Sequence, residues 1–382
     1  MPPSTSDTAL PQARFRSVPE DFWVEEIPAY APSGHGEHLF ITFEKRDLTT
    51  PDAVRLLARA LEADAKNAGT AGMKDKRAVT IQSASFLFPA SRDAEALLSA
   101  FSHPQLRVLH VSRHENKLKP GHLIGNRFRI VLRGLSAESV TQVREKLDEL
   151  AKTGVPNAFG PQRFGRDGDN PERALSWVSG KSKPPRDKRE QRFLFSALQS
   201  LMFNRVLDLR VKDGSWRTVL AGDLAKKHDT GGLFLVPSDE EGLKDAKERA
   251  LSGLVSATGP MFGAKMRWPE GAAAELERQV LCEAVGEPER LDGFRALGEG
   301  TRRALRLWVS DLRVPHESDG EKALGDNSLT VHFVLPKGSY ATTVLGCACA
   351  LVEGHGRNHG DESDAKDVDA ETSEGGEASL ED

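Results

Sequence analysis

Hydrophobic and polar residues alternate in several short stretches of the chain, a pattern typical of β-strands that bury one face. In residues 128–132, for example, Phe, Ile and Leu alternate with Arg and Val. Alternation and enrichment in β-branched and aromatic residues predict strands at residues 22–27, 39–43, 78–88, 106–111, 128–132 and 329–335. Most predicted strands therefore lie in the first part of the chain, and one comes close to its end.

Apolar residues at helical spacing predict helices between these strands. Thr50 is expected to cap the first helix, with Pro51 at its first helical position, and the pattern ends near Asn67. Further helices are predicted at residues 93–101, 136–150, 186–212, 239–251, 272–285 and 341–352. Because strands and helices do not alternate strictly, the pattern favours an α+β fold with a mixed, largely antiparallel sheet.

The character of the chain changes near Pro184. A long helical pattern and Gly- and Pro-rich connections follow, and a strand pattern returns only at residues 329–335. We interpret this order as a middle segment that is inserted into a domain whose last strand comes at the end. The chain is long enough for two or three domains.

Charge is distributed unevenly over the 382 residues, whose formal net charge is −5. Residues 353–382 contain eleven acids and two bases, whereas the first 352 residues carry a net charge of +4. The acidic segment lacks apolar periodicity, so residues 353–382 are predicted to be a disordered tail, and residues 1–12 a disordered N-terminus. Bases gather in residues 107–133 and 163–192. Such runs suit a phosphate backbone, although each run alone also fits a solvated surface.

Several classes of protein are disfavoured by what the sequence lacks. Its three cysteines form neither a disulfide framework nor a zinc pattern, which predicts a reducing, cytoplasmic location. No apolar run approaches the roughly 20 residues of a membrane helix, so we expect no membrane association. The sequence has no Walker loop and no dinucleotide fingerprint, so no nucleotide cofactor is predicted. Two His pairs at i, i+4 spacing lack further ligands nearby, so no metal site is predicted.

The first motif that could carry chemistry is a Gly-rich loop around Asp75. Gly69 and Gly72 precede it and allow tight backbone curvature, and Lys74, Lys76 and Arg77 flank the carboxylate. A carboxylate at a loop tip among bases can act as a nucleophile or as a base. On composition alone, however, an Asp beside a Lys also fits a turn or a surface ion pair.

The second motif spans residues 155–165 and combines amide, aromatic and guanidinium groups. Asn157 could bond a base edge, Phe159 could stack on a base face, and Arg163 could contact phosphate. The alternative is a turn whose rings lie in the core, and we prefer that alternative for Phe164. A third motif, residues 335–345, places Tyr340 at a helix start, where its ring could stack on a base or cover the core.

Taken together, five separated stretches resemble the TruD family of pseudouridine synthases, which isomerise one uridine in tRNA. Each motif alone is weak, but their order and spacing are specific. Residues 191–204 and 259–263 also resemble the family's middle segment, and the match runs from about residue 14 to 352. The five stretches are residues 19–22, 72–82, 116–128, 157–165 and 338–342.

The resemblance implies a domain organisation and a partner. Residues 13–182 and 315–352 would form the pseudouridine-synthase catalytic domain, and residues 183–314 an inserted TruD-specific α/β domain. The substrate would be tRNA, usually the uridine at position 13 of a subset of tRNAs. The reaction would need no cofactor, and nothing requires more than a monomer.

The resemblance also implies roles for single residues. Asp75 would be the catalytic carboxylate, and Phe22, Asn157 and Tyr340 would hold the flipped-out target base. Arg16 lies where the family usually has a Lys that faces the catalytic Asp. Lys74 could pair with Asp75 instead, but we favour Arg16, because successive side chains tend to point apart. Either cation would favour the ionised carboxylate.

The chemistry of the residues agrees with this interpretation. Uridine isomerisation needs no redox partner, energy donor or metal, but it needs one well-placed carboxylate and a base outside its stack. Whether Asp75 would attack C1′, attack C6 or move a proton stays open. Removal of residues 353–382 is expected to leave catalysis intact and to strengthen RNA binding at low salt.

Two departures from the family pattern leave an alternative open. Ala158 stands where the family commonly has an aromatic residue, and Gly346 and Cys347 stand where an Arg-Glu pair usually follows. These departures put the support around the site and the tRNA preference in doubt, and they motivate a non-catalytic tRNA-binding or folding protein on the same scaffold. A glycosidic hydrolase would need a second acid opposite Asp75, for which no motif has an equal claim.

Overall fold

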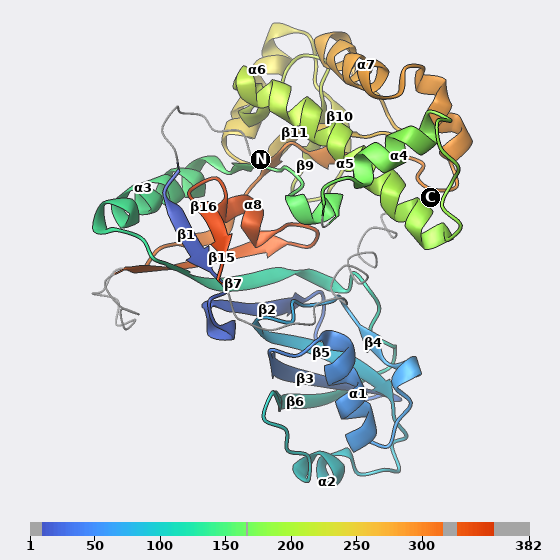
Figure 1. The fold of residues 1–382 in the computed structure, drawn as a ribbon, viewed down its shortest axis with the longest axis vertical. Helices are drawn as coiled ribbons and strands as arrows, with labels where there is room; N and C mark the ends of the chain where they lie inside the picture. The colour runs from blue at the N-terminus through green and yellow to red at the C-terminus, as the bar shows by residue number, and fades with distance from the viewer. Residues whose placement is uncertain (1–9, 166, 316–326, 355–382) are drawn as a thin grey trace. The chain divides into compact units, whose positions relative to one another are not determined.

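The computed structural model describes residues 10–165, 167–315 and 327–354, which form two compact units. We call residues 10–151, 309–341 and 348–354 the sheet unit, and residues 152–308 and 342–347 the helical unit. Figure 1 shows the elements of both units along the chain. The helical unit begins near Lys152, about thirty residues before the expected start of an inserted domain, so the boundary at residue 183 stays a prediction.

The sheet unit is built on one mixed sheet. Its central strands run in the order β14-β15-β7-β2-β5-β3-β6, β4 pairs with β5, and β1 joins β7 to β16. Only the β2–β5 and β1–β16 pairs are parallel among the described strands. The expected α+β class with a largely antiparallel sheet is therefore confirmed. The strands are β1 (Gln12–Phe15), β2 (Phe22–Pro28), β3 (His38–Arg46), β4 (Gly69–Thr70), β5 (Val79–Leu87), β6 (Leu106–His114), β7 (Leu123–Arg133), β14 (Ser310–Arg313), β15 (Ser328–Pro336) and β16 (Ala350–Glu353).

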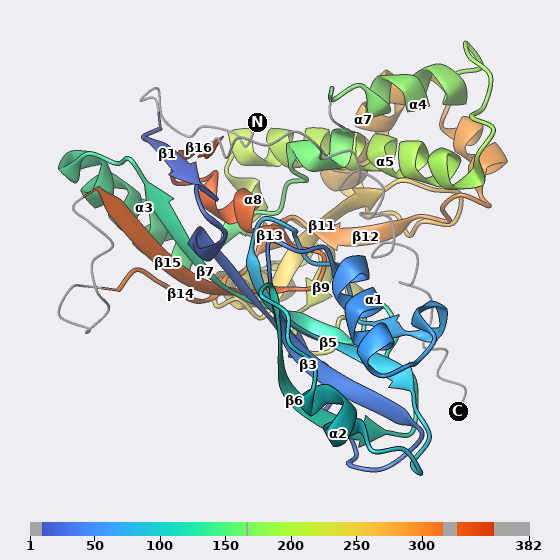
Figure 2. The same ribbon diagram turned by 60° about the horizontal axis from the view of Figure 1, so that its bottom comes forward.

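Helices α1 (Thr50–Ala60) and α2 (Ala94–Ser99) cover part of one sheet face, as Figure 2 shows. The helix α3 (Ala137–Thr153) follows β7. The core beneath α1 contains Leu57 at the helix and Phe43 and Phe86 at the strands. In the strands every second side chain faces the helices, and in α1 the side chains about one turn apart face the sheet. These apolar side chains therefore meet in one core.

The N-terminus of α1 differs from its prediction by one residue. The cap is Thr49, whose hydroxyl accepts a hydrogen bond from the backbone N–H of Asp52, and Thr50 is the first helical residue. The helix also ends at Ala60 instead of near Asn67, and a separate 3-10 turn, η2 (Ala65–Asn67), follows. The Thr50 hydroxyl is thereby left for a contact with the loop around Asp75.

The helical unit combines several helices with a small antiparallel sheet. Its strand order is β10-β9-β11-β12, and a separate two-stranded pair joins β8 to β13. Helix α5 contributes to two cores, with Leu198 in one and Phe203 in the other. The elements are β8 (Val155–Pro156), η3 (Pro161–Phe164), α4 (Asn170–Val178), α5 (Lys188–Lys212), η4 (Ser215–Arg217), β9 (Leu224–Lys227), β10 (Leu233–Leu235), α6 (Glu240–Leu251), β11 (Val255–Met261), α7 (Gly271–Val285), η5 (Pro288–Phe294), β12 (Thr301–Ala304) and β13 (Arg306–Leu307).

The C-terminal part of the described chain corrects a prediction. The helix expected at residues 341–352 is only the short α8 (Ala341–Leu345), and the chain then forms strand β16. Glu353 belongs to this strand and Gly354 is described, so the predicted disordered tail does not begin at residue 353. Likewise β1 begins at Gln12, whereas residues 1–9 and 355–382 lie outside the described residues.

No helix in the described ranges is long and apolar enough to cross a membrane. The same ranges contain no cluster of three or more His, Cys, Asp or Glu side chains that could hold a metal ion.

Candidate active site

The loop that carries Asp75 connects β4 to β5 and is fixed through its backbone. The Lys74 N–H donates to the Thr50 hydroxyl (3.1 Å), which in turn donates to the Gln82 side-chain oxygen (3.0 Å). Before the loop, Gly69 passes so close to another segment that a Cβ there would lie 2.1 Å from the Leu118 carbonyl oxygen. Glycine is therefore required by close backbone approach at the start of the loop.

A buried lysine provides the strongest anchor of this loop. Lys45 on β3 is fully buried, and its ammonium donates to the Asp75 carbonyl oxygen (2.8 Å) and to that of Lys74 (3.4 Å). A buried ammonium is costly unless polar groups surround it, so its donors are strongly directed to available carbonyls. Lys45 thereby holds the backbone of Asp75, while the Asp75 carboxylate stays partly exposed to solvent.

Asp75 pairs with Arg16, as expected from the sequence. Arg16 Nη2 lies 3.0 Å from Asp75 Oδ1, and the Asp75 side chain is 46% exposed. Arg16 has a positive φ of 55°, in the left-handed region that non-glycine residues seldom adopt. Its guanidinium lies 4.1 Å from the centroid of the Phe22 ring. The backbone turn and the ring together direct the cation toward the carboxylate.

Phe22 itself is buried, with only 2% of its surface exposed. Its ring packs beside Phe15 and against the edge of Phe128, with centroids 6.5 and 6.1 Å apart, and Arg16 lies over it. The structure therefore places this ring beneath Arg16, in the core of the sheet unit. This location supports a role in positioning Arg16 more directly than a stacking contact with a base.

Lys74 points to a different partner. Its ammonium lies 2.9 Å from Glu26 Oε2, and both side chains are at least 95% buried. Although Lys74 is next to Asp75 in sequence, its ammonium pairs with Glu26 in the interior of the sheet unit. Lys74 therefore pairs with Glu26 and not with Asp75, and a role of Lys74 in substrate binding stays a prediction.

The end of the C-terminal strand lies at the same ion pair. Glu353 Oε1 on β16 lies 3.4 Å from Arg16 Nη1, the second terminal nitrogen of the guanidinium. The next residue is held as well, because the Gly354 N–H donates to the Phe15 carbonyl (2.9 Å) and its own carbonyl accepts from Arg77 (3.3 Å). A Cβ at Gly354 would lie 2.5 Å from Ser17 Cα, so the approach is tight.

In the helical unit, Asn157 is held by groups from β12. Its Nδ2 donates to the Ala304 carbonyl (2.8 Å), and its Oδ1 accepts from Arg303 (2.6 Å). The Arg303 guanidinium also lies 4.2 Å from the centroid of Phe159. Asn157 and Phe159 are largely buried, at 7% and 9% exposed. Arg303 therefore connects the two residues that the sequence had selected, and no sequence signal pointed to it.

Arg163 does not lie at the surface. It is 3% exposed, and its guanidinium donates to the hydroxyls of Ser200 and Ser196 on α5. One turn of α5 supplies both hydroxyls, and a contact of Arg163 with phosphate stays a prediction. Phe164 packs partly buried against the adjacent core, which agrees with the preferred interpretation.

Tyr340 lies in the sheet unit directly before α8 and is half-buried. The segment after it belongs to the helical unit, where the Thr343 hydroxyl donates to the Ala158 carbonyl (3.3 Å). This bond uses the backbone of residue 158, so the Ala158 departure from the family pattern does not remove it. A role of Tyr340 in base stacking stays a prediction.

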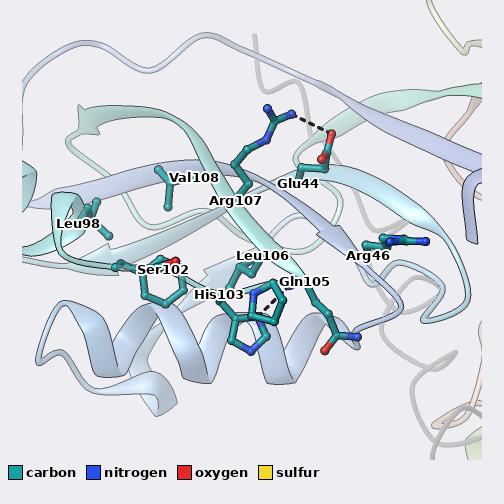
Figure 3. A pocket seen from close by; sticks show the side chains of 11 residues that line it. Glu44, Arg46, Leu98, Ser102, His103, Gln105, Leu106, Arg107 and Val108 are labelled. Carbon is teal, nitrogen blue, oxygen red and sulfur yellow. Dashed lines mark hydrogen bonds and ion pairs between the residues drawn. The ribbon is translucent and has the colours of Figure 1, made fainter.

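Many bases of the stretch 107–133 have acidic or carbonyl partners. Arg127 pairs with Glu25 (2.7 Å), and Arg133 bonds both carboxylate oxygens of Asp21, which raises the pKa of Arg133. Arg107 pairs with Glu44 (3.3 Å) at a pocket of about 430 Å³ beside β3 and β6, shown in Figure 3. None of the predicted site residues lines this pocket.

Comparison with known proteins identifies the family. The sequence model of tRNA pseudouridine synthase D (TruD) matches residues 3–171 and 186–346. The chain is 45% identical over 338 residues to tRNA pseudouridine synthase D of Anaeromyxobacter sp. strain Fw109-5, covering 86% of this chain and 90% of that protein. It is 41% identical over 345 residues to a protein of that name from Thermus thermophilus, covering 89% of this chain and 90% of that protein.

A solved structure agrees with these sequence matches. The crystal structure from Methanosarcina mazei that is assigned to tRNA pseudouridine synthase D superposes with a TM-score of 0.72 at 26% identity. It covers 91% of this chain and 96% of that one. The fold, the motifs and the close sequence relatives lead to one conclusion: the chain belongs to the TruD family of tRNA pseudouridine synthases.

Proposed function

We propose that this protein converts a uridine of tRNA to pseudouridine, with Asp75 as the catalytic carboxylate. Membership of the TruD family supports an isomerase that acts on tRNA. The observation that carries the assignment of Asp75 is its geometry. A half-exposed carboxylate in the motif of the family is held by one guanidinium nitrogen at 3.0 Å, on a loop whose backbone is anchored by buried Lys45.

The reaction balances without a co-reactant. The N1–C1′ bond breaks, the base turns, and a C5–C1′ bond forms, while C5 loses a proton and N1 gains one. A carboxylate can attack a carbon of the nucleoside or carry the proton between these positions. Arg16 places a positive charge beside this carboxylate, with Nη2 3.0 Å from Oδ1, which suits each of these roles.

The proposed target is the uridine at position 13 of a subset of tRNAs, as the family resemblance implies. Tyr340 and Asn157 are proposed to contact the extruded nucleotide, with Phe159 beside Asn157. The half-buried ring of Tyr340 suits stacking. Asn157 Nδ2 has two hydrogens, of which the bond to the Ala304 carbonyl uses one, so among the described residues the other can serve a base edge. Phe22 is proposed to act through Arg16, on whose face it lies.

The test uses total tRNA that carries 5-tritiated uridine and comes from cells lacking this protein. Wild-type protein is expected to release tritium, because C5 loses its hydrogen when the new bond forms. Asp75→Asn keeps the size of the side chain and removes its charge, so release should fall at least a thousandfold while tRNA binding stays within about twofold. Undiminished release by Asp75→Asn would remove Asp75 from the mechanism. No release by wild-type protein on any tRNA would favour the non-catalytic tRNA-binding alternative.

A further inference from the structure

Arg16 is shared between two carboxylates, and the sharing has a chemical consequence. Nη2 lies 3.0 Å from Asp75 Oδ1 and Nη1 lies 3.4 Å from Glu353 Oε1. The Arg16 side chain is only 11% exposed, and its Nε is buried with no hydrogen-bond partner within the described ranges. The two terminal nitrogens of the fork thus serve different acids.

A guanidinium that faces a single carboxylate tends to bond both of its oxygens. Such a bidentate pair would occupy Oδ1 and Oδ2 of Asp75 together and leave no unpaired oxygen for the reaction. In this protein Nη1 donates a hydrogen bond to Glu353 Oε1, while Nη2 forms the ion pair with Asp75, 3.0 Å from Oδ1. A lysine at position 16 would raise no such problem, because an ammonium is a point charge without a fork.

The position of Glu353 is built into the fold. Strand β16 pairs in parallel with β1, and the register places Glu353 opposite Phe15, next to Arg16. The contacts of Gly354 with Phe15 and Arg77 hold the end of the strand. The pairing of β16 with β1 therefore positions the Glu353 carboxylate beside Arg16.

We infer that Glu353 is a positioning residue that binds Nη1 of Arg16, prevents the guanidinium from bonding both oxygens of Asp75, and so keeps the second oxygen of Asp75 available for catalysis. This inference rests on the proposed role of Asp75. It predicts that Glu353 affects kcat only when residue 16 is an arginine, whose guanidinium can bond two carboxylate oxygens at once. Exposed ion pairs contribute little to stability, so the effect should be on turnover and not on folding.

The experiment measures kcat and KM for tritium release from tRNA with the full-length chain. Glu353→Ala is expected to lower kcat about tenfold, because both terminal nitrogens of Arg16 can then bond Asp75. KM should change less than twofold. A tenfold loss of kcat corresponds to about 1.4 kcal/mol of activation free energy. Glu353→Asp should recover much of the loss. In an Arg16→Lys background, Glu353→Ala should change kcat less than twofold.

The matched control is Glu62→Ala, which removes an exposed carboxylate that pairs with Arg92 in the same unit and should leave kcat unchanged. Thermal unfolding checks the fold, and Glu353→Gln replaces Glu353→Ala if the latter unfolds. An unchanged kcat in Glu353→Ala, or an equal loss in both backgrounds, would overturn the inference. Asp75→Asn separates the two proposals: if it stays active, the assignment of Asp75 fails first.

Discussion

Lys74 and Asp75 are adjacent in sequence, yet they meet different partners. The loop has no regular structure at these positions, and successive side chains diverge, so the carboxylate reaches Arg16 while the ammonium reaches Glu26 inside the unit. The Lys74–Glu26 pair is almost completely buried, which makes each charge dependent on the other. Lys74 is therefore explained by a structural role: its pair with Glu26 fixes the loop that carries Asp75.

Lys74→Met is expected to lower the free energy of unfolding by about 3 kcal/mol, because it leaves a buried carboxylate without its cation. Combining it with Glu26→Leu should restore most of the loss, since both charges are then removed. Urea unfolding at neutral pH measures both effects, and Lys146→Met, which breaks a partly exposed pair with Glu149, is the control. Unchanged stability with weakened tRNA binding would instead support Lys74 as a substrate ligand.

At the scale of elements, local patterns predicted most α-helices and six long strands of the main sheet, but they predicted none of the strands of the helical unit. Tertiary pairing decided some of the exceptions. Residues 341–352 have helical spacing, but β1 supplies a parallel partner, so the chain leaves the helix at Leu345 and forms β16. The same pairing brings Glu353 to Arg16. Sequence reasoning found Asp75 and Arg16 through their motifs, but it grouped Glu353 with an acidic tail. Lys45 and Arg303 were missed, because no local pattern tells which buried strand position will carry a charge.

The small sheet of the helical unit contains a histidine whose ionisation should affect its stability. His228 follows β9, and its Nε2 lies 2.8 Å from the Ser256 hydroxyl on β11. Burial lowers the pKa of His228, and Lys226 and Arg306 lower it further, whereas Asp229 raises it. In the unfolded chain the pKa returns to about 6.5. Between the folded and unfolded pKa values the unfolded state binds more protons, so stability falls as pH drops below about 6.5.

We therefore expect amide hydrogen exchange of β9 and β11 to accelerate as pH falls from about 7 toward about 5, after correction for the intrinsic exchange rate. His228→Gln should reduce this dependence, because glutamine does not titrate. His110→Gln, at an exposed position on β6, is the control and should leave it unchanged. An identical pH dependence in His228→Gln and wild-type protein would exclude His228 as its source.

At the scale of the whole molecule, the net charge of −5 conceals an uneven distribution. Residues 355–382 contain ten acids and two bases, so the chain without them carries +3. Several arginines of the basic stretch are nonetheless paired with acids in the sheet unit. The surplus positive charge that an RNA backbone would meet is therefore smaller than the count of bases suggests, and the acidic segment reduces it further.

The structure also moves the boundary at which the acidic segment can be removed. Deletion of residues 355–382 should leave kcat within about twofold of wild type and tighten tRNA binding at low salt, because a net eight negative charges are lost. The gain should shrink as salt rises, since the Debye length falls to about 8 Å at 0.15 M ionic strength. A second, longer deletion, of residues 350–382, removes strand β16 and Glu353 in addition. Its kcat should therefore fall at least tenfold. Filter-binding titrations at several salt concentrations and tritium release measure the two effects. Equal kcat in both deletions would show that β16 is not needed for turnover, and salt-independent affinity would show that the charge of the segment does not act on RNA.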